Sequence, residues 1–101
     1  MAQFDVYRNP SPTSSGRAPY FVEVQGNYCA VKSTCVIIPL VISTAFFPAP
    51  VLNPLILLDG VEYILSTAEI TAVARSRLGR RIGSIQRYHN EILRAIDRLL
   101  E

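Results

Sequence analysis

The fold is decided by one stretch of the sequence, Leu55-Ile56-Leu57-Leu58-Asp59-Gly60-Val61-Glu62-Tyr63-Ile64-Leu65. Its Asp-Gly pair stands between two runs of β-forming residues, and Asp-Gly in that setting is the signature of a type I′ hairpin. The stretch therefore predicts two antiparallel strands, over 55–58 and 61–65, and a sheet is the expected core of the protein.

Further strands are predicted on both sides of this hairpin. Alternation of apolar and polar residues predicts strands over 3–7 and 20–25, and a continuous apolar run over 35–40 is typical of a strand buried on both faces. In the second of these strands, Phe21 is expected to point into the core. A weaker alternation predicts a last strand over 70–78.

The segments between the strands contain residues that break or cap regular structure. Three prolines, four Ser or Thr residues and a glycine within 8–19 predict a long loop. Ser66 and Glu69 have the spacing of a capping box, which predicts a short helical turn at that point.

The C-terminal segment predicts one amphipathic helix over about 84–100. Ser84 is a favourable N-cap residue, and apolar residues then recur every three or four positions. They are Ile85, Tyr88, Ile92, Ile96 and Leu99, with Ala95 beside them. The expected architecture is a single domain over 1–101, mainly β with a C-terminal helix. Its strands are expected within 3–78 and to form an SH3-like small barrel or twisted antiparallel sheet.

Composition excludes a disordered chain and favours self-association. Half of the 101 residues are hydrophobic and 18% are charged, whereas disordered chains combine low hydrophobicity with high charge. A domain of this size buries only about 60 to 70% of the surface of its unfolded chain, so this apolar composition predicts a homodimer. No apolar run reaches the ~20 residues of a membrane span, and no secretory signal is recognisable. A cytoplasmic protein without membrane contact is therefore expected.

The sequence offers few residues for metal or nucleophilic chemistry. Cys29 and Cys35 are too few for a disulfide framework or a four-ligand zinc site, and free thiols are expected rather than a bridge between them. The one histidine, His89, is expected to be solvated or partly packed, because near neighbours such as Glu91 do not share its helix face. No catalytic residue, cofactor or metal is predicted.

The C-terminal third is rich in arginine. Between positions 75 and 98, seven arginines stand against Glu91 and Asp97, a local balance of +5. The seven are Arg75, Arg77, Arg80, Arg81, Arg87, Arg94 and Arg98. Such a face fits phosphates or an acidic partner, and a solvated surface explains it equally well. Glu69 with Arg75 and Arg77 has the residue types for RNA cleavage, although their spacing does not favour that role.

Four segments of the chain resemble the CcdB family of toxins. They are Gln3-Phe4-Asp5-Val6-Tyr7, Tyr20-Phe21-Val22-Glu23-Val24-Gln25, Val36-Ile37-Ile38-Pro39-Leu40 and Glu91-Ile92-x-x-Ala95-Ile96-Asp97. Their order, their spacing and the total length are similar to the family from end to end. The resemblance implies a homodimeric SH3-like barrel, related in fold to the MazF toxins. It also implies the toxin of a type II toxin–antitoxin pair, a system of plasmid maintenance.

The resemblance further implies partners and a mode of action. Members of the family bind the A subunit of DNA gyrase, a topoisomerase, and trap its cleaved complex with DNA. They inhibit by binding rather than by turnover, so the chain is not expected to be an enzyme, and it would meet DNA only through gyrase. A cognate CcdA-like antitoxin neutralises such toxins with a disordered C-terminal segment.

The sequence departs from the family where the family contacts gyrase. Gyrase-poisoning members carry Trp-Gly-Ile after the helix. Alignment of the helix places Leu100 at an aromatic position and Glu101 at the tryptophan, and the sequence has no counterpart of the last two residues. Tyr28 and Cys29 stand where the family has two exposed aliphatic residues, so a changed contact set is expected. The predicted target-binding residues are Tyr28, Arg94, Asp97, Arg98, Leu99, Leu100 and Glu101.

Two other functions stay open at this point. A chain with this fold that has lost gyrase poisoning would serve mainly as an antitoxin-binding protein. A MazF-like endoribonuclease would use Arg75, Arg77, Arg80 and Arg81 on the phosphates of RNA.

Overall fold

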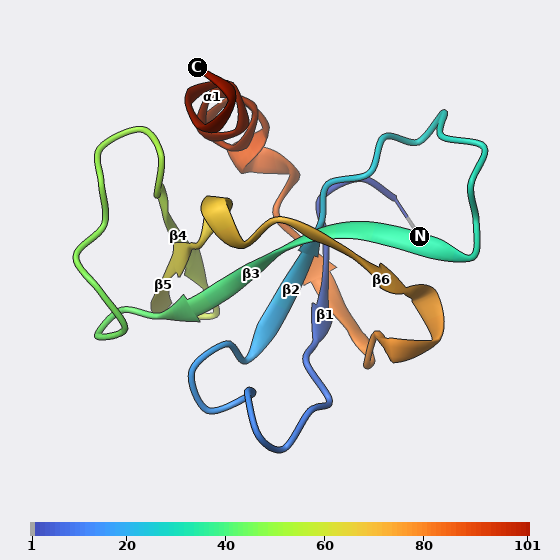
Figure 1. Cartoon of the computed structure of the whole chain (residues 1–101). Helices are drawn as coiled ribbons and strands as arrows, with labels where there is room; N and C mark the ends of the chain where they lie inside the picture. The colour runs from blue at the N-terminus through green and yellow to red at the C-terminus, as the bar shows by residue number, and fades with distance from the viewer. Residues whose placement is uncertain (1) are drawn as a thin grey trace.

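The structure, a computed structural model, describes residues 2–101. Within them, seven strands form one antiparallel sheet, and one α-helix lies at the C-terminal end (Figure 1). The strands are β1 (Asp5–Arg8), β2 (Tyr20–Glu23), β3 (Thr34–Ile42), β4 (Leu55–Leu58), β5 (Val61–Leu65), β6 (Thr71–Ala74) and β7 (Arg81–Ser84), and the helix is α1 (His89–Leu100). Three single-turn 3-10 helices are η1 (Thr67–Glu69), η2 (Arg75–Arg77) and η3 (Gln86–Tyr88).

The long strand β3 organises the sheet. β2 pairs with one edge of β3, while β6 and β5 pair one after the other with its opposite edge. β1 and β7 extend the sheet beyond β2, and β4 extends it beyond β5. Residues 37–41 of β3 are all buried, which confirms the prediction of a strand covered on both faces. The chain is a half-barrel with a C-terminal helix, as the sequence predicts.

The main core lies between the sheet and α1. Val6, Val22 and Leu40 from the strands pack with Ile92 and Ala95 from the helix, all of them fully buried. A smaller cluster of Ala18, Val41 and Ile64 lies on the other face of the sheet. The predicted apolar stripe of the helix is thus confirmed.

Phe21 does not lie in the main core, and that prediction is wrong. In β2 it is Val22 that faces α1, whereas Phe21 is half-buried on the opposite face and lies across from Pro39 of β3. An alternating strand has two faces, and alternation alone does not tell which of them the helix covers.

The hairpin that decides the fold has the predicted turn. Asp59 and Gly60 both have positive φ, 50° and 79°, as a type I′ turn requires. Both flanking strands begin and end where the sequence predicts them.

The helix predicted from Ser84 begins instead at His89. Ser84 ends β7, a strand that lies beyond the predicted limit of 78 and pairs with β1. The Ser84 hydroxyl accepts the N–H of Gln86 at 3.2 Å, so it holds η3 rather than α1. The pairing with β1, and not local propensity, makes this segment extended.

The short helical turn predicted after Ser66 is confirmed as η1, but two details of the predictions between 66 and 78 need correction. The predicted strand over 70–78 is limited to β6, because residues 75–77 turn as η2. The Ser66 side chain makes no capping bond to the backbone; its hydroxyl donates to the carboxylate of Glu69. Across residues 2–101, no helix has the length and apolar character that a membrane crossing requires.

Gly79 provides a test of this packing. Its N–H donates to the carbonyl oxygen of Arg8 at 2.9 Å, and an added Cβ would lie 2.6 Å from that oxygen. We predict that Gly79→Ala lowers the free energy of unfolding in urea by about 1–3 kcal/mol through this overlap. At Gly83 an added Cβ meets nothing within 4 Å. Gly83→Ala is the matched control, expected to leave the stability unchanged or to raise it by up to about 1 kcal/mol. An equal loss in both variants contradicts the placement of Gly79.

Candidate partner-binding surface

Four of the predicted target-binding residues meet at the C-terminal end of α1. Arg94, Asp97, Arg98 and Glu101 line a shallow hollow of about 240 Å³ together with Val51 of the β3–β4 segment. They lie together because the apolar stripe of the helix faces the sheet and leaves this side in solvent. We call these five residues the helix hollow.

The hollow combines both signs of charge with a strained backbone. Arg98 and Glu101 form an ion pair with an Nε–Oε1 distance of 3.6 Å, and both side chains are more than half exposed. Val51 has a φ of 68°, a left-handed conformation that is unfavourable for a β-branched residue and costs of order 1–3 kcal/mol. Such outliers cluster at binding sites.

The two leucines near the end of the helix differ in exposure. Leu100 is 77% exposed beside the hollow, whereas Leu99 is half-buried. Of these two predicted target-binding residues, Leu100 has the side chain that is accessible to a partner.

Tyr28 lies apart from the hollow, in the loop that joins β2 to β3. Its side chain is fully exposed. This segment, residues 24–33, is called the Tyr28 loop. Figure 1 shows the Tyr28 loop and α1 on the same side of the sheet, at its upper right and upper left. The predicted site residues therefore form two patches on one side of the molecule.

The N-terminal segment connects these two patches. The N–H of Gln3 donates to Asn27 Oδ1 in the Tyr28 loop at 2.8 Å. The next residue, Phe4, places its ring edge-to-face against His89 at the start of α1, with 5.3 Å between the ring centroids. His89 is half-buried, which confirms that it is partly packed.

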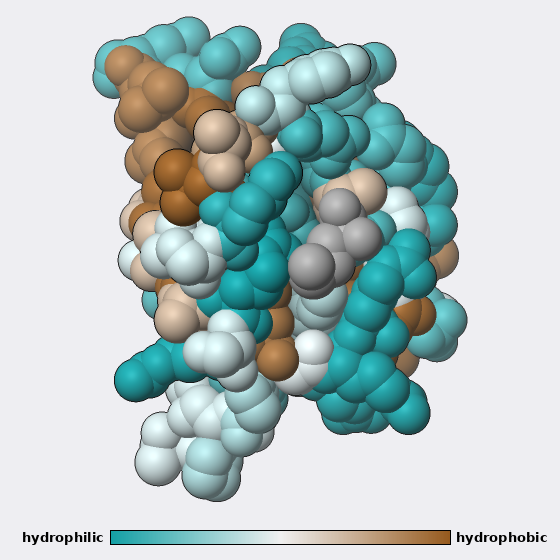
Figure 2. Space-filling view, turned by 90° about the vertical axis from the view of Figure 1, so that its right-hand side faces the viewer, coloured by the Kyte–Doolittle hydropathy of each residue, from teal (hydrophilic) through white to brown (hydrophobic). Residues whose placement is uncertain are grey.

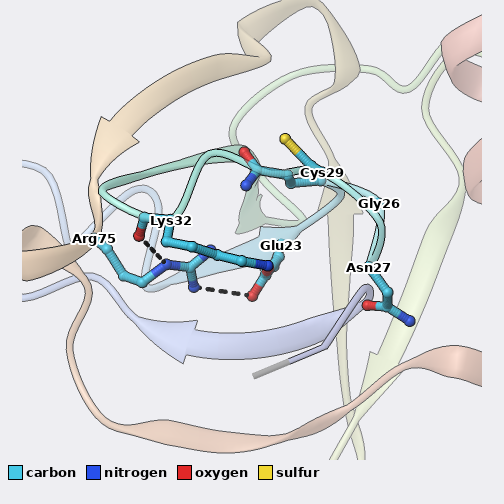
Figure 3. Close-up of a pocket in the computed structure, with 7 residues that line it drawn as sticks. Glu23, Gly26, Asn27, Cys29, Lys32 and Arg75 are labelled. Atoms are coloured by element: carbon cyan, nitrogen blue, oxygen red, sulfur yellow. Dashed lines mark hydrogen bonds and ion pairs between the residues drawn. The ribbon is translucent and has the colours of Figure 1, made fainter.

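A pocket of about 210 Å³ lies under the Tyr28 loop (Figure 3). Its lining residues are Glu23, Gln25, Gly26, Asn27, Cys29, Lys32 and Arg75. The Glu23 side chain is 6% exposed and forms an ion pair with Arg75 across 3.3 Å. Sequence reasoning missed this pair because its members are far apart in the chain. The available signal was the acidic residue Glu23 within a predicted strand, since a buried carboxylate requires a cation close to it.

Burial and the nearby Glu23 carboxylate together raise the pKa of two neighbouring groups. The hydroxyl of Tyr7 donates to Glu23 Oε1 at 3.2 Å. Burial, together with the negative charge of Glu23, raises the pKa of Tyr7 to about 12. Burial and the same carboxylate raise the pKa of the Cys35 thiol to about 11, so Cys35 is protonated and unreactive near neutral pH.

The arginine-rich segment is partly neutralised from elsewhere in the chain. Arg75 is paired with Glu23, and Arg81 with Asp5 at 3.0 Å. Burial alone would raise the pKa of Asp5, but the hydrogen bond and charge of Arg81, with the N–H of Ala2, hold it below the usual value.

The face on the right of Figure 1, with the Tyr28 loop and η2, is mostly hydrophilic, and an apolar patch lies at one upper corner (Figure 2).

The residues considered for RNA cleavage are not brought together. Glu69 lies with neither Arg75 nor Arg77; its carboxylate pairs with Arg17 at 3.1 Å and accepts the hydroxyl of Ser66. This cluster borders a groove of about 380 Å³ on the face of the sheet opposite α1, and Phe21 is part of its lining.

The described residues contain no group of three His, Cys, Asp or Glu side chains that could hold a metal ion. Both cysteines are free thiols, as expected.

Comparisons with known proteins agree with this architecture. The family model described as CcdB protein matches residues 3–101. No curated protein sequence matches the chain significantly. A solved structure of an endoribonuclease in complex with its cognate antitoxin, from a mycobacterial species, is similar with a TM-score of 0.74. The alignment covers 99% of this chain and 94% of that chain at 15% identity, so this likeness establishes the fold alone.

The two cysteines give a test of the buried cluster. Cys29 is half-buried in the pocket wall and Cys35 is fully buried. We predict that a thiol-alkylating reagent near pH 7.5 modifies Cys29 first and Cys35 only when the protein unfolds, as followed by mass spectrometry. In Cys29→Ser, modification of the folded protein should be lost. Rapid modification of both thiols, or of Cys35 alone, contradicts the burial of Cys35 beside Glu23.

Proposed function

The chain belongs to the CcdB family, and on that premise we propose that this toxin binds the A subunit of DNA gyrase and traps its cleaved complex with DNA. The proposal rests on one observation. The exposed side of α1 places Arg94, Asp97, Arg98 and Glu101 around one hollow, next to Leu100. An apolar anchor within a rim of charged groups is the usual arrangement of a binding hot spot.

The proposed action is binding without turnover. The side chains of the hollow suit ion pairs with a partner surface and have no arrangement for acid–base chemistry. Glu101 stands at the aligned position of the family's tryptophan, and its carboxylate would attract an arginine of the target but cannot stack on it. Leu100 and Tyr28 therefore supply the apolar contacts in this proposal.

The proposed partners include a second copy and an antitoxin. Large apolar side chains are exposed at Phe47, Leu55, Leu57 and Val61, among other positions, and a homodimer would cover part of this surface. The similar solved structure contains an endoribonuclease in complex with its cognate antitoxin, which supports a cognate CcdA-like antitoxin as the neutralising partner of this chain.

A gyrase assay with purified proteins tests the main proposal. We predict gyrase-dependent DNA cleavage with the wild-type protein. Leu100→Ala should require at least about tenfold more protein for the same cleavage, because a buried leucine contact is worth about 1.5–3 kcal/mol. Arg94→Ala should also raise the amount of protein needed for the same cleavage. Its control is Arg77→Ala, because Arg77 is an exposed arginine outside the hollow.

Two outcomes contradict this assignment. If Arg77→Ala weakens cleavage as much as Arg94→Ala, the hollow is not the contact. If the wild-type protein causes no cleavage at any excess over gyrase, gyrase poisoning is excluded. Tight binding of a cognate antitoxin would then favour the antitoxin-binding function.

An endoribonuclease is the second candidate function. The Arg17, Glu69 and Ser66 cluster favours it, and the solved endoribonuclease of similar fold supports it. In this mechanism Glu69 takes the proton of a ribose 2′-hydroxyl, whose oxygen bonds to the adjacent phosphorus. The bond from phosphorus to the 5′-oxygen breaks, and that oxygen takes up a proton. Arg17 would offset the developing charge on the phosphate.

Incubation with a defined single-stranded RNA tests this candidate. If it holds, the RNA is cut to products ending in a 2′,3′-cyclic phosphate, and Glu69→Gln reduces the rate at least about a hundredfold, as loss of a general base does. Arg94→Ala, an exposed arginine of the helix hollow away from this groove, is the control with an unchanged rate. Intact RNA with the wild-type protein, or equal rates with Glu69→Gln, dismisses a ribonuclease at this cluster.

A further inference from the structure

The Tyr28 loop spans ten residues, 24–33, between β2 and β3, and side chains from outside its tip hold it in place. Gln25 acts at the base, where its amide nitrogen donates to the carbonyl of Val31 at 2.9 Å and its amide oxygen accepts the N–H of Val36 at 3.2 Å. These two bonds join the two ends of the loop to each other. The second also ties the base of the loop to β3, but neither bond involves Lys32 or Ser33 at the other end of the loop.

Besides the bond from the N–H of Gln3 to Asn27, Arg75 connects the loop to the rest of the molecule. It follows β6, far from the loop in sequence, and its backbone N–H donates to the carbonyl of Ser33 at 2.9 Å. Its side-chain Nε donates to the carbonyl of Lys32 at 3.2 Å. Figure 3 shows the guanidinium beneath the loop, between this carbonyl and the carboxylate of Glu23.

The other nitrogens of the same guanidinium bind Glu23. Nη1 and Nη2 donate to the two carboxylate oxygens at 3.4 and 3.3 Å. The side chain of Arg75 is 18% exposed and that of Glu23 6%, so the pair is shielded from solvent. A planar guanidinium presents its donors in a fixed fork. Its position on Glu23 therefore also sets the position of the Lys32 carbonyl.

We propose that Arg75 is a positioning residue of the partner-binding surface, which clamps the Lys32 end of the Tyr28 loop to Glu23 of β2 and so presents Tyr28. This inference rests on the proposed function in that Tyr28 contacts the partner. It adds a residue of η2 that touches no partner itself. The tip of the loop contributes little apolar burial, because Tyr28 and Val31 are exposed, so polar contacts determine its conformation.

The clamp has two separable parts, which makes the proposal testable. Removal of the whole side chain would leave Glu23 buried without its cation and threatens folding. Arg75→Lys keeps a cation for Glu23, but a single ammonium lacks the fork that reaches both the carboxylate and the Lys32 carbonyl. Arg77→Lys, two positions along η2 on an exposed side chain, is the matched control.

The experiment combines hydrogen exchange with binding. In Arg75→Lys, the amides of residues 26–33 should exchange at least about tenfold faster than in the wild type, while those of β3 stay protected. Binding to the purified A subunit of gyrase should weaken about tenfold. Arg77→Lys should change neither quantity.

A double-mutant cycle separates positioning from a general loss of stability. If Arg75 acts through Tyr28, Tyr28→Ala and the double variant Tyr28→Ala/Arg75→Lys bind the A subunit of gyrase equally weakly. The proposal is overturned if the two substitutions cause additive losses of binding free energy. It is also overturned if Arg75→Lys changes neither the exchange rates of the loop nor the binding to the A subunit. A wild-type protein that does not bind the A subunit of gyrase overturns the proposed function as well as the role of Tyr28 there. The exchange rates would still report separately on the clamp.

Discussion

The structure depends on the pairing of β3 along both of its edges. Nine residues in one strand bond to β2 on one side and to β6 and β5 on the other. Pro39 can stand in the middle of this strand because it needs no partner for an N–H, and its carbonyl accepts the N–H of Ser66. The two ends of β3 also place the binding surface. The Tyr28 loop enters at one end, and the segment with Val51, which lines the helix hollow, leaves at the other.

Charge acts in this molecule through arginines that pair with buried carboxylates rather than through the net balance. Glu23 and Asp5 are both buried strand residues, and each is paired with an arginine, Arg75 of η2 and Arg81 at the start of β7. A carboxylate without its partner would be costly at either place. These pairs therefore fix the course of the β6–β7 segment over the sheet. The arginines of α1 remain for the proposed partners; within residues 2–101, Arg98 is the one arginine of the helix held in an ion pair, to Glu101.

Local patterns predicted the hairpin and the apolar stripe of α1, because Asp59-Gly60 and a repeat of three to four residues act within a few positions. β7 was missed because Arg81-Ile82-Gly83-Ser84 has little strand propensity, and its pairing with β1 supplies the extended conformation. The partners of Glu23 and Glu69 also lay beyond sequence reasoning. Each arginine stands 52 positions from its carboxylate, and only the folded sheet brings them together.

In the proposed function, the Tyr28 loop and the helix hollow form one partner-binding surface. Hydrogen exchange of the full chain, measured alone and bound to the purified A subunit of gyrase, tests this surface. We expect slower exchange on binding in both the Tyr28 loop and the last turns of α1, with the β4–β5 turn unchanged. Protection confined to the groove beside Phe21, or absent from either patch, would contradict it.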